Sequence, residues 1–401
     1  MRLLVLDTIH GGGVIAASLA VQGHQVDAVD VYRGEGGVPE EVAMERQYDL
    51  LVTPVHLDPR HPLLHHHRCP AITHHQAVRW ILGDRVPHPF IEVTGAQGKT
   101  TTATALASVM EGPGILHTST GTYQYPERTI LFRSSITPAS EIAAAEAAMA
   151  IGGWLIAEVS LGVTGAGDLA VLTSKNDYRC AAGTRSALEE KIRSVATAPA
   201  VVVPHEVRIA HRHQVSVDQV TTISEDQCRF TFQGEAGHFI NSLLLLPAYQ
   251  SPLALATTAA LILGQDPSRL GDFEPLAGRM KISNSGPALI VDNANSGVCR
   301  ATTREAMDTA RRLNPEKPVT LVIGEEEHAV CEGFPPEEIM AAIEETGPAS
   351  VVLVGETARE IQSGLPKDRS RVTKTLDGAI PMAEELTPQG GSIVLAVKMW
   401  R

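Results

Sequence analysis

Short apolar runs alternate with helical patterns over residues 1–88 of the chain. The runs LLVLDT, QVDAVDVY and DLLVTPVHL are as long as buried strands, and VIAASLAVQG between the first two has the pattern of a helix. Strands that alternate with helices are typical of a parallel sheet with helical connections. We therefore predict a small Rossmann-like domain at residues 1–88.

Residues 89–275 continue this alternation and are predicted to form a second domain. A strand, a glycine loop and a helix are indicated by EVTGAQGKTTTATALASVM, and the buried-strand patterns WLIAEVSLG and LAVLTSKND end in polar residues. Because ligands of open α/β sheets bind at the carboxyl ends of strands, these polar ends are the expected active site. The apolar run from Leu243 to Gly264 is interrupted by Pro247 and Pro252, so we predict a buried strand leading into a core helix, not a membrane span.

Residues 276–401 contain four more strand patterns, PALIVD, PVTLVIG, SVVLVG and SIVLAV, separated by helical or loop segments. They predict a third, smaller α/β domain of Rossmann-like character. The expected fold class is therefore α/β, with three domains at residues 1–88, 89–275 and 276–401.

Composition narrows the class of protein. The 401 residues exceed a single hydrophobic core, which agrees with several domains. The net charge of −13 argues against a nucleic-acid partner, which a basic face would have to attract. Five cysteines without a CxxC pair suit reduced thiols, and the opening MRLLVLDTIHGGG has too short an apolar core for a signal peptide. We expect a cytoplasmic protein with no nucleic-acid and no membrane partner; nothing in the sequence decides its oligomeric state.

A nucleotide site is indicated by one glycine-rich run, whose residues are Gly95, Ala96, Gln97, Gly98, Lys99, Thr100 and Thr101. The run is shorter than the standard GxxxxGKT loop. Its glycines let backbone N–H groups face phosphates, Lys99 offsets the charge of the β and γ oxygens, and the Thr100 hydroxyl can bind Mg²⁺. The run therefore predicts a bound nucleotide and magnesium.

The loop TGAQGKTTT resembles the TGTNGKTTT loop of the Mur ligase superfamily, which includes peptidoglycan amide ligases and folylpolyglutamate synthetase. The resemblance implies three domains in this order: a Rossmann-like substrate-binding domain, a central P-loop ATPase domain and a Rossmann-like C-terminal domain. It also implies ATP and Mg²⁺ as cofactors. The segment AEVSLG resembles the family's EVSS segment, which makes Glu158 a magnesium ligand and a catalytic candidate beside Lys99.

A further segment, DLAVLTSKNDYRCAAGTRSALEEKI, resembles the family's TNxxxDHLD element. Asp177 matches the family aspartate, but Tyr178 replaces the histidine that follows it. Lys191 falls near the lysine that is carbamylated in some members, which implies a place at the metal site. An exposed helical lysine without a role is the alternative.

In the third domain, VDNANSG resembles the family's DDYAHNP or DGAHNP element. This makes Asp292 a candidate for binding the ribose hydroxyls, with Asn295 beside it in place of the family histidine. Arg279 in LAGRM matches the linker arginine that is expected to reach the γ-phosphate, and it is the third catalytic candidate. Tyr249, Gln250 and Ser251 stand where the family has an adenine-contacting asparagine region, so the contact with adenine stays open.

The opening LVLDTIHGG, together with EVSLG and VDNANSGV, resembles a branch of the superfamily from methanogens. By that resemblance the chain activates a propionate of a nickel tetrapyrrole as an acyl phosphate and closes a carbocyclic ketone. Nickel is then part of the small-molecule substrate and not a cofactor. Two alternatives are an amide ligase that joins an amino acid or amine to a carboxylate, and a nucleotide-gated binding protein without turnover.

Histidines are unusually dense at the end of the first predicted domain: His56, His61, His65, His66, His67, His74, His75 and His88. They are expected either to face the tetrapyrrole or its carboxylates, or to form a polar loop without a ligand. The HGGG motif from His10 to Gly13 opens the first helix and either binds a substrate carboxylate or makes a tight turn.

Overall fold

The computed structural model describes residues 1–34, 36–326 and 333–399. It contains two compact units, the first ending at Phe273 and the second beginning at Glu274. Both units are α/β, as the sequence predicts. The division of the first unit at residue 88 stays a prediction. Of the five cysteines, Cys331 lies outside the described residues.

The first sheet of the N-terminal unit has four parallel strands in the order β2-β1-β3-β4. Its elements are β1 (Arg2–Leu6), α1 (Gly13–Val21), β2 (Gln25–Val29), α2 (Glu40–Glu45), β3 (Leu50–Thr53), α3 (Pro62–His66), β4 (Ala71–Thr73) and α4 (His74–Leu82). Leu3 and Val5 pack into the core shared with α1 and α4, whereas Leu4 and Leu6 pack into a second core with α2 and α3. From Leu3 to Leu6, β1 is apolar without interruption because helices cover both of its faces.

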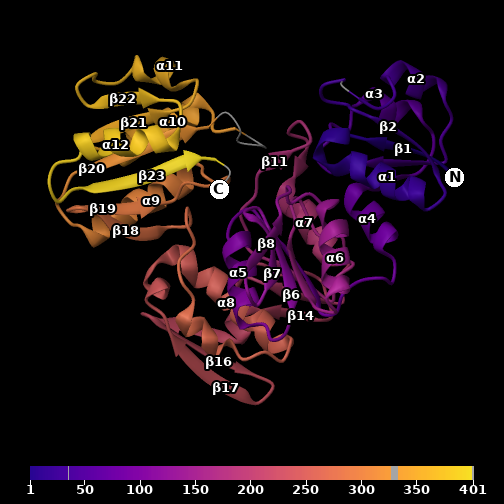
Figure 1. Cartoon of the computed structure of the whole chain (residues 1–401), viewed down its shortest axis with the longest axis horizontal. Helices are drawn as coiled ribbons and strands as arrows, with labels where there is room; N and C mark the ends of the chain where they lie inside the picture. The colour runs from indigo at the N-terminus through magenta and orange to yellow at the C-terminus, as the bar shows by residue number, and fades with distance from the viewer. Residues whose placement is uncertain (35, 327–332, 400–401) are drawn as a thin grey trace. The chain divides into compact units, whose positions relative to one another are not determined.

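The central sheet has eight strands in the order β14-β13-β10-β5-β9-β6-β7-β8. Its strands are β5 (Phe90–Thr94), β6 (Gly114–Thr118), β7 (Gly121–Tyr125), β8 (Thr129–Phe132), β9 (Trp154–Glu158), β10 (Leu169–Leu172), β13 (Ala200–Val203) and β14 (Gln214–Ser216). Pairing is parallel from β14 to β6, and β7 and β8 extend that edge antiparallel. Figure 1 shows α5 (Lys99–Val109) and α8 (Pro247–Ile262) on one side of this sheet, and α6 (Ser140–Ala150) and α7 (Ala187–Val195) on the other.

Smaller elements complete the first unit. They are β11 (Arg179–Cys180), β12 (Arg185–Ser186), the 3₁₀ turn Val217–Gln219, β15 (Thr221–Ser224), β16 (Gln227–Phe232), β17 (Glu235–Ile240), and the 3₁₀ turns Ser242–Leu245 and Pro267–Asp272. Strands β15, β16 and β17 form an antiparallel sheet.

The predicted strand at the start of the apolar run 243–264 is wrong. A short 3₁₀ turn stands there, and α8 begins at Pro247. Proline is favoured at the first position of a helix because an N–H at that position would have no partner within the helix. Helix α8 is buried along most of its length, which explains its apolar sequence. Within the described part of the chain, no helix combines the length and apolarity that a membrane crossing requires.

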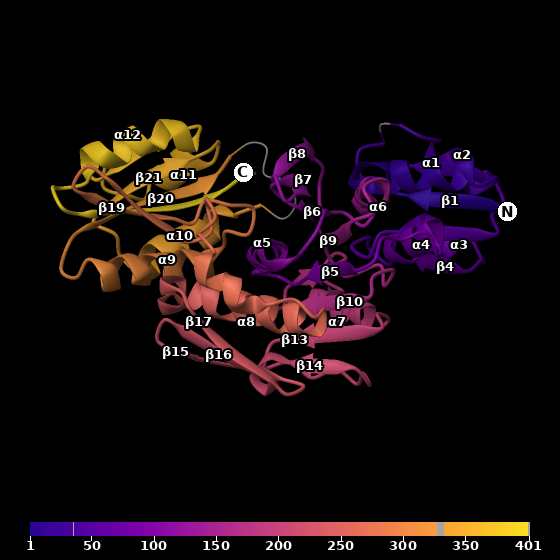
Figure 2. The ribbon, with the colours of Figure 1, turned by 60° about the horizontal axis from the view of Figure 1, so that its bottom comes forward.

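The second unit has a six-stranded sheet in the order β18-β19-β23-β20-β21-β22. Its elements are β18 (Lys281–Ser285), β19 (Ala288–Asp292), α9 (Arg300–Leu313), β20 (Val319–Glu325), α10 (Pro336–Thr346), β21 (Ser350–Val354), α11 (Ala358–Gln362), β22 (Ser370–Thr373), α12 (Leu376–Leu386) and β23 (Ser392–Lys398). The four predicted strands are β19, β20, β21 and β23, and they pair in parallel. Figure 2 shows α9 and α10 on one face of this sheet and α12 on the other.

A pair of fully buried acids lies inside the first unit. The carboxylate of Glu92 in β5 accepts hydrogen bonds from the backbone N–H groups of Thr164, Gly165 and Gly167 and from the Thr164 hydroxyl. Glu141 in α6 faces it, and burial together with the negative charge of Glu92 raises the pKa of Glu141 well above its usual range. Burial raises the pKa of Glu92 as well, but the N–H groups that it accepts from favour its charged form, so Glu141 keeps its proton to the higher pH.

This pair predicts a pH-dependent stability. Because the pKa of Glu141 is higher in the folded chain than in the unfolded chain, the folded chain binds more protons between these two values, and the free energy of unfolding falls as pH rises through that range. Glu141→Gln carries no titrating proton, so the decline above about pH 5 should become shallower, by at most roughly 1.4 kcal/mol per pH unit. Urea unfolding at several pH values measures this. Glu146→Gln, at an exposed position of the same helix, is the control; parallel profiles for wild type and Glu141→Gln would contradict the assignment.

Candidate active site

Four neighbouring parallel strands end at one edge of the central sheet. In the order β10-β5-β9-β6, their carboxyl ends lead to Ser174, Gly95, Glu158 and Ser119. The phosphate loop is the connection from β5 to α5, as predicted. The predicted gathering of polar strand ends is therefore present at this edge.

The phosphate loop requires its two glycines. Gly95 has φ 152° and Gly98 has φ 79°, both in the region that L side chains rarely adopt. A Cβ at Gly95 would overlap the Thr173 side chain, and a Cβ at Gly98 would lie 3.4 Å from Pro252 Cγ in α8. The loop is thus pressed against the chain after β10 and against α8.

Residues that follow β10 hold the loop in place. The backbone N–H groups of Ala96 and Gln97 donate to Ser174 Oγ at 3.2 and 3.4 Å, and Asn176 Nδ2 donates to Gln97 Oε1 at 3.0 Å. Helix α5 begins at Lys99, and the N–H groups of its first turn have no partner within the helix. This end of α5 is suited to the negative charge of a phosphate.

The predicted magnesium ligands contact each other. Thr100 Oγ1 donates to Glu158 Oε2 at 2.8 Å, and the N–H of Ser119 donates to the same oxygen at 3.1 Å. Ser119 Oγ lies 3.2 Å from Thr100 Oγ1, and Lys99 Nζ lies 3.7 Å from Glu158 Oε1. Oxygen donors from one carboxylate and two hydroxyls match what Mg²⁺ prefers, so these residues fit a magnesium ion with its nucleotide.

The lysine predicted near the metal site is buried. Lys191 in α7 is 1% exposed, so the alternative of an exposed helical lysine is wrong. Its Nζ lies 4.4 Å from the ring centroid of Tyr178, the residue that replaces the family histidine. The neighbouring Asp177 accepts from Ser186 Oγ and from the N–H of Leu188, both at 2.8 Å, and so caps the start of α7. Lys191 as a metal-site residue stays a prediction.

The remaining predicted nucleotide contacts lie in the second unit. Asp292 ends β19, and its oxygens accept from the N–H groups of Gly278 at 3.0 Å and Ala294 at 3.1 Å. Asn295 Nδ2 donates to the Gly278 carbonyl at 2.7 Å. Both side chains therefore hold the segment that carries Arg279 close to the end of β19. Their roles toward ribose and the γ-phosphate stay predictions.

In the segment predicted to lie near adenine, Tyr249 is buried and Gln250 is half-buried. Tyr249 is 1% exposed, and Gln250 Nε2 donates to the Leu244 carbonyl at 2.9 Å. Both side chains thus stabilise the start of α8.

The dense histidines do not form one cluster. His74 and His75 are buried, contact the carbonyl oxygens of Leu6 and Ser160 at 2.9 Å, and burial lowers the pKa of each to about 4. Both are therefore neutral near pH 7 and unsuited to pairing with substrate carboxylates. His88 lies 3.0 Å from an oxygen of Asp168, far along the chain.

The other histidines of this part of the chain also have different surroundings. His61 lies 3.6 Å from Glu40, and His65 and His66 are exposed. The HGGG motif forms a tight turn, because Gly11 has φ 98° and a Cβ at Gly12 would overlap the Asp7 carbonyl. His56 instead approaches Asp7 and His10, a grouping that the sequence analysis missed.

Comparison with known proteins shows what this chain is similar to. The family model described as coenzyme F430 synthetase CfbE, C-terminal domain, matches residues 282–399. Coenzyme F(430) synthetase from Methanosarcina acetivorans is 29% identical over 473 aligned positions, which cover 100% of this chain and 99% of that protein.

Solved structures show the same fold. UDP-N-acetylmuramate-alanine ligase MurC from Thermotoga maritima aligns with a TM-score of 0.54 and 12% identity over 99% of this chain and 95% of that one. A pseudomurein peptide ligase type C from Methanothermus fervidus gives 0.52 and 13% over 99% and 97%. Bifunctional folylpolyglutamate synthase/dihydrofolate synthase from Yersinia pestis gives 0.59 and 16% over 82% and 92%. The chain therefore has the Mur ligase fold and resembles coenzyme F(430) synthetase along its whole length, which supports an ATP-dependent ligase.

Proposed function

We propose that this chain is an ATP-dependent ligase that converts the nickel tetrapyrrole seco-F(430) acid into coenzyme F(430) by closing a carbocyclic ring. The observation that carries the ATP-dependent step is the grouping of Lys99, Thr100 and Glu158 at the start of α5. The choice of substrate rests on the full-length similarity to coenzyme F(430) synthetase.

The proposed reaction has two steps. A propionate oxygen of the substrate attacks the γ-phosphorus of ATP, and ADP leaves. A carbon of the same macrocycle then loses a proton and attacks the acyl carbon, and phosphate leaves with the C–O electron pair. Bound Mg²⁺ would supply further positive charge to the phosphates. Lys99 and the N–H groups at the start of α5 offset the charge that develops on the transferring phosphoryl group.

A carbon nucleophile is plausible because it belongs to the activated molecule. Holding two reacting groups in one macrocycle replaces a second binding event, and well-oriented intramolecular reactions gain the equivalent of about 7–11 kcal/mol. The protein then has to activate the acid, orient it and exclude water, which would hydrolyse the acyl phosphate.

The amide ligase is the second candidate, because the solved relatives include a MurC and a pseudomurein peptide ligase. Mass spectrometry of the product after incubation with ATP, Mg²⁺ and the acid separates the two. Ring closure predicts a product lighter than the acid by one water, with one ADP and one phosphate per turnover and no amine required. A product that contains an added amine would establish the amide ligase, and one that retains phosphate would indicate a kinase. ATP binding without phosphate release would favour a nucleotide-gated binding protein.

A further inference from the structure

We propose that Asp7, His10 and His56 bind one divalent transition-metal ion of the zinc or nickel type. Among the described residues, these three form a group whose ligand atoms all lie within 4.8 Å of one another. We call them the Asp7 site. This proposal goes beyond the ligase reaction and concerns a position other than the magnesium site at Thr100 and Glu158.

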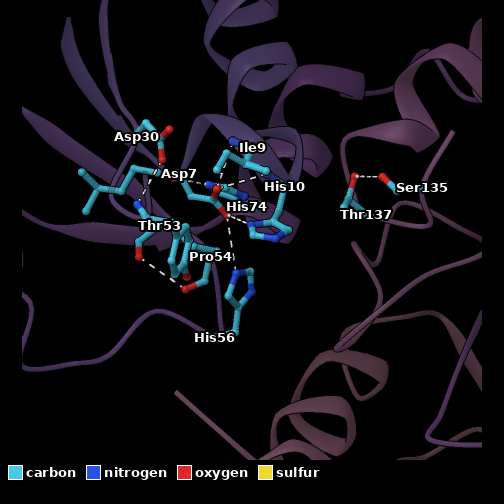
Figure 3. A network of polar contacts seen from close by, with 12 residues as sticks. Asp7, Ile9, His10, Asp30, Thr53, Pro54, His56, His74, Ser135 and Thr137 are labelled. Atoms are coloured by element: carbon cyan, nitrogen blue, oxygen red, sulfur yellow. Dashed lines mark hydrogen bonds and ion pairs between the residues drawn. The ribbon is translucent and has the colours of Figure 1, made fainter. Parts of the chain in front are cut away.

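The fold brings the three side chains together from two strand ends. Asp7 directly follows β1, and His56 follows β3, the parallel neighbour of β1. The carboxyl ends of parallel neighbours lie at the same edge of a sheet, where ligands commonly bind. His10 belongs to the turn Thr8–Gly12 that connects β1 to α1. Figure 3 shows His10 and His56 converging on the Asp7 carboxylate.

The distances suit a metal ion. Asp7 Oδ2 lies 2.9 Å from His10 Nδ1 and 3.5 Å from His56 Nε2. In a tetrahedral zinc site with bonds of about 2.0–2.2 Å, neighbouring ligand atoms lie roughly 3.3–3.6 Å apart. The three ligand atoms all lie within 4.8 Å of one another, so adjustments of the side chains can place one ion between them.

Neighbouring groups orient the ligands. Asp7 Oδ1 accepts from the N–H groups of Ile9 and His10 at 3.0 and 3.1 Å, which leaves Oδ2 directed at the two imidazoles. Asp7 has φ 75°, an uncommon conformation for a residue with a side chain, as found at functional sites. The Tyr32 ring stacks on His56 with centroids 5.7 Å apart and meets His10 edge-on at 5.3 Å. These ring contacts restrict the orientation of both imidazoles.

The surroundings of His56 also favour binding of an ion. Its Nε2 is buried and, within the described part of the chain, makes no hydrogen bond; its approach to Asp7 Oδ2 at 3.5 Å is an ion-pair contact. The side chains of His10 and His56 are 30% and 28% exposed, so an ion can enter from solvent. The Asp7 side chain is fully buried.

The set of ligand atoms selects the class of ion. Two imidazole nitrogens and one carboxylate oxygen suit zinc, nickel or cobalt, whereas magnesium prefers oxygen ligands throughout. Three converging protein ligands also argue for a free ion and against the nickel of a tetrapyrrole. A macrocycle occupies four positions around its metal and leaves one axial position on each face, so only one of these side chains could reach it.

Cobalt titration of the metal-free, full-length protein tests the proposal, with excess Mg²⁺ present. We expect the visible absorption of protein-bound Co²⁺ to saturate at one equivalent and to be displaced by Zn²⁺. His56→Gln should weaken Co²⁺ binding at least about tenfold, because it removes one of three ligands. Asp7→Asn is a second variant, used only if its circular dichroism matches that of wild type.

The exposed pair His65 and His66 provides the matched control, because adjacent surface histidines also bind such ions. The double variant His65→Gln, His66→Gln should retain the one-equivalent site. Loss of binding in this control with full retention in His56→Gln would overturn the proposal in favour of surface binding. Absence of saturable Co²⁺ binding would also overturn it. That conclusion would hold even if the nickel absorption of the tetrapyrrole changed when this substrate binds to the protein. Neither result bears on ATP-dependent turnover, which is measured separately.

Discussion

Replacing Lys99 with alanine is expected to lower the turnover number at least about 100-fold while the chain stays folded. Lys99 begins α5, directly after the glycine loop, and its side chain is 16% exposed. Its ammonium lies 3.7 Å from Glu158 Oε1, next to the proposed metal position. Because the lysine meets negative charge that grows on the transferring phosphoryl group, its loss destabilises the transition state more than the bound substrates.

Phosphate release in the presence of the acid measures this effect, and circular dichroism verifies the fold. Lys175→Ala is the control. Lys175 also follows a strand of the central sheet, β10, but it is exposed and its Nζ lies 3.3 Å from a carboxylate oxygen of Glu206. Its rate should stay within about twofold of wild type, since exposed ion pairs contribute little. A Lys99→Ala rate above about a tenth of wild type would show that this loop is not the catalytic phosphate site.

The phosphate loop could be predicted because its determinants are local. A buried strand, two glycines with positive φ, and a lysine and threonine at the start of a helix occupy consecutive positions from Phe90 to Thr100. The same holds for the strands with long apolar runs, such as β1, β9, β10 and β20, which can be identified without knowing their neighbours. The α/β class and the strand-loop-helix unit therefore followed from the sequence.

The partners of the loop could not be predicted in this way. Ser119 and Ser174 reach it because β6, β9, β5 and β10 lie near one another in the sheet, and this order is not encoded in the periodicity of any single strand. Each serine stands in a polar segment after a strand, which was the available signal. That signal identifies an edge of a sheet and not a contact.

Proximity along the chain was misleading for the histidines. His74 and His75 are consecutive, yet one contacts the end of β1 and the other the segment after β9. The Asp7 site instead joins residues almost fifty positions apart, as a result of the pairing of β1 with β3. The prediction of a strand before α8 was wrong for a different reason. An apolar run that is buried on all sides has no periodicity that distinguishes a helix from a strand.

Replacing Glu158 with glutamine is the second change with a large expected effect. Its Oε2 accepts from the Thr100 hydroxyl and the Ser119 N–H, so the carboxylate orients the threonine as well as facing the proposed ion. Glutamine keeps the shape and one oxygen but loses the negative charge, and its amide N–H₂ can face the Lys99 ammonium. We expect turnover to fall at least about tenfold and the Mg²⁺ concentration for half-maximal activity to rise by a similar factor.

Activity measured against Mg²⁺ concentration separates a ligand from a merely structural acid. A structural acid lowers the maximal rate without moving the magnesium midpoint, whereas a ligand moves the midpoint because binding of the ion itself is weaker. Glu206→Gln, which replaces an exposed acid that pairs with exposed Lys175, should change neither quantity. Glu158→Asp retains the charge on a shorter side chain, so it should restore part of the magnesium affinity that Glu158→Gln loses. If the midpoint of Glu158→Gln equals that of wild type, Glu158 acts by positioning Thr100 and Lys99 and is not a magnesium ligand.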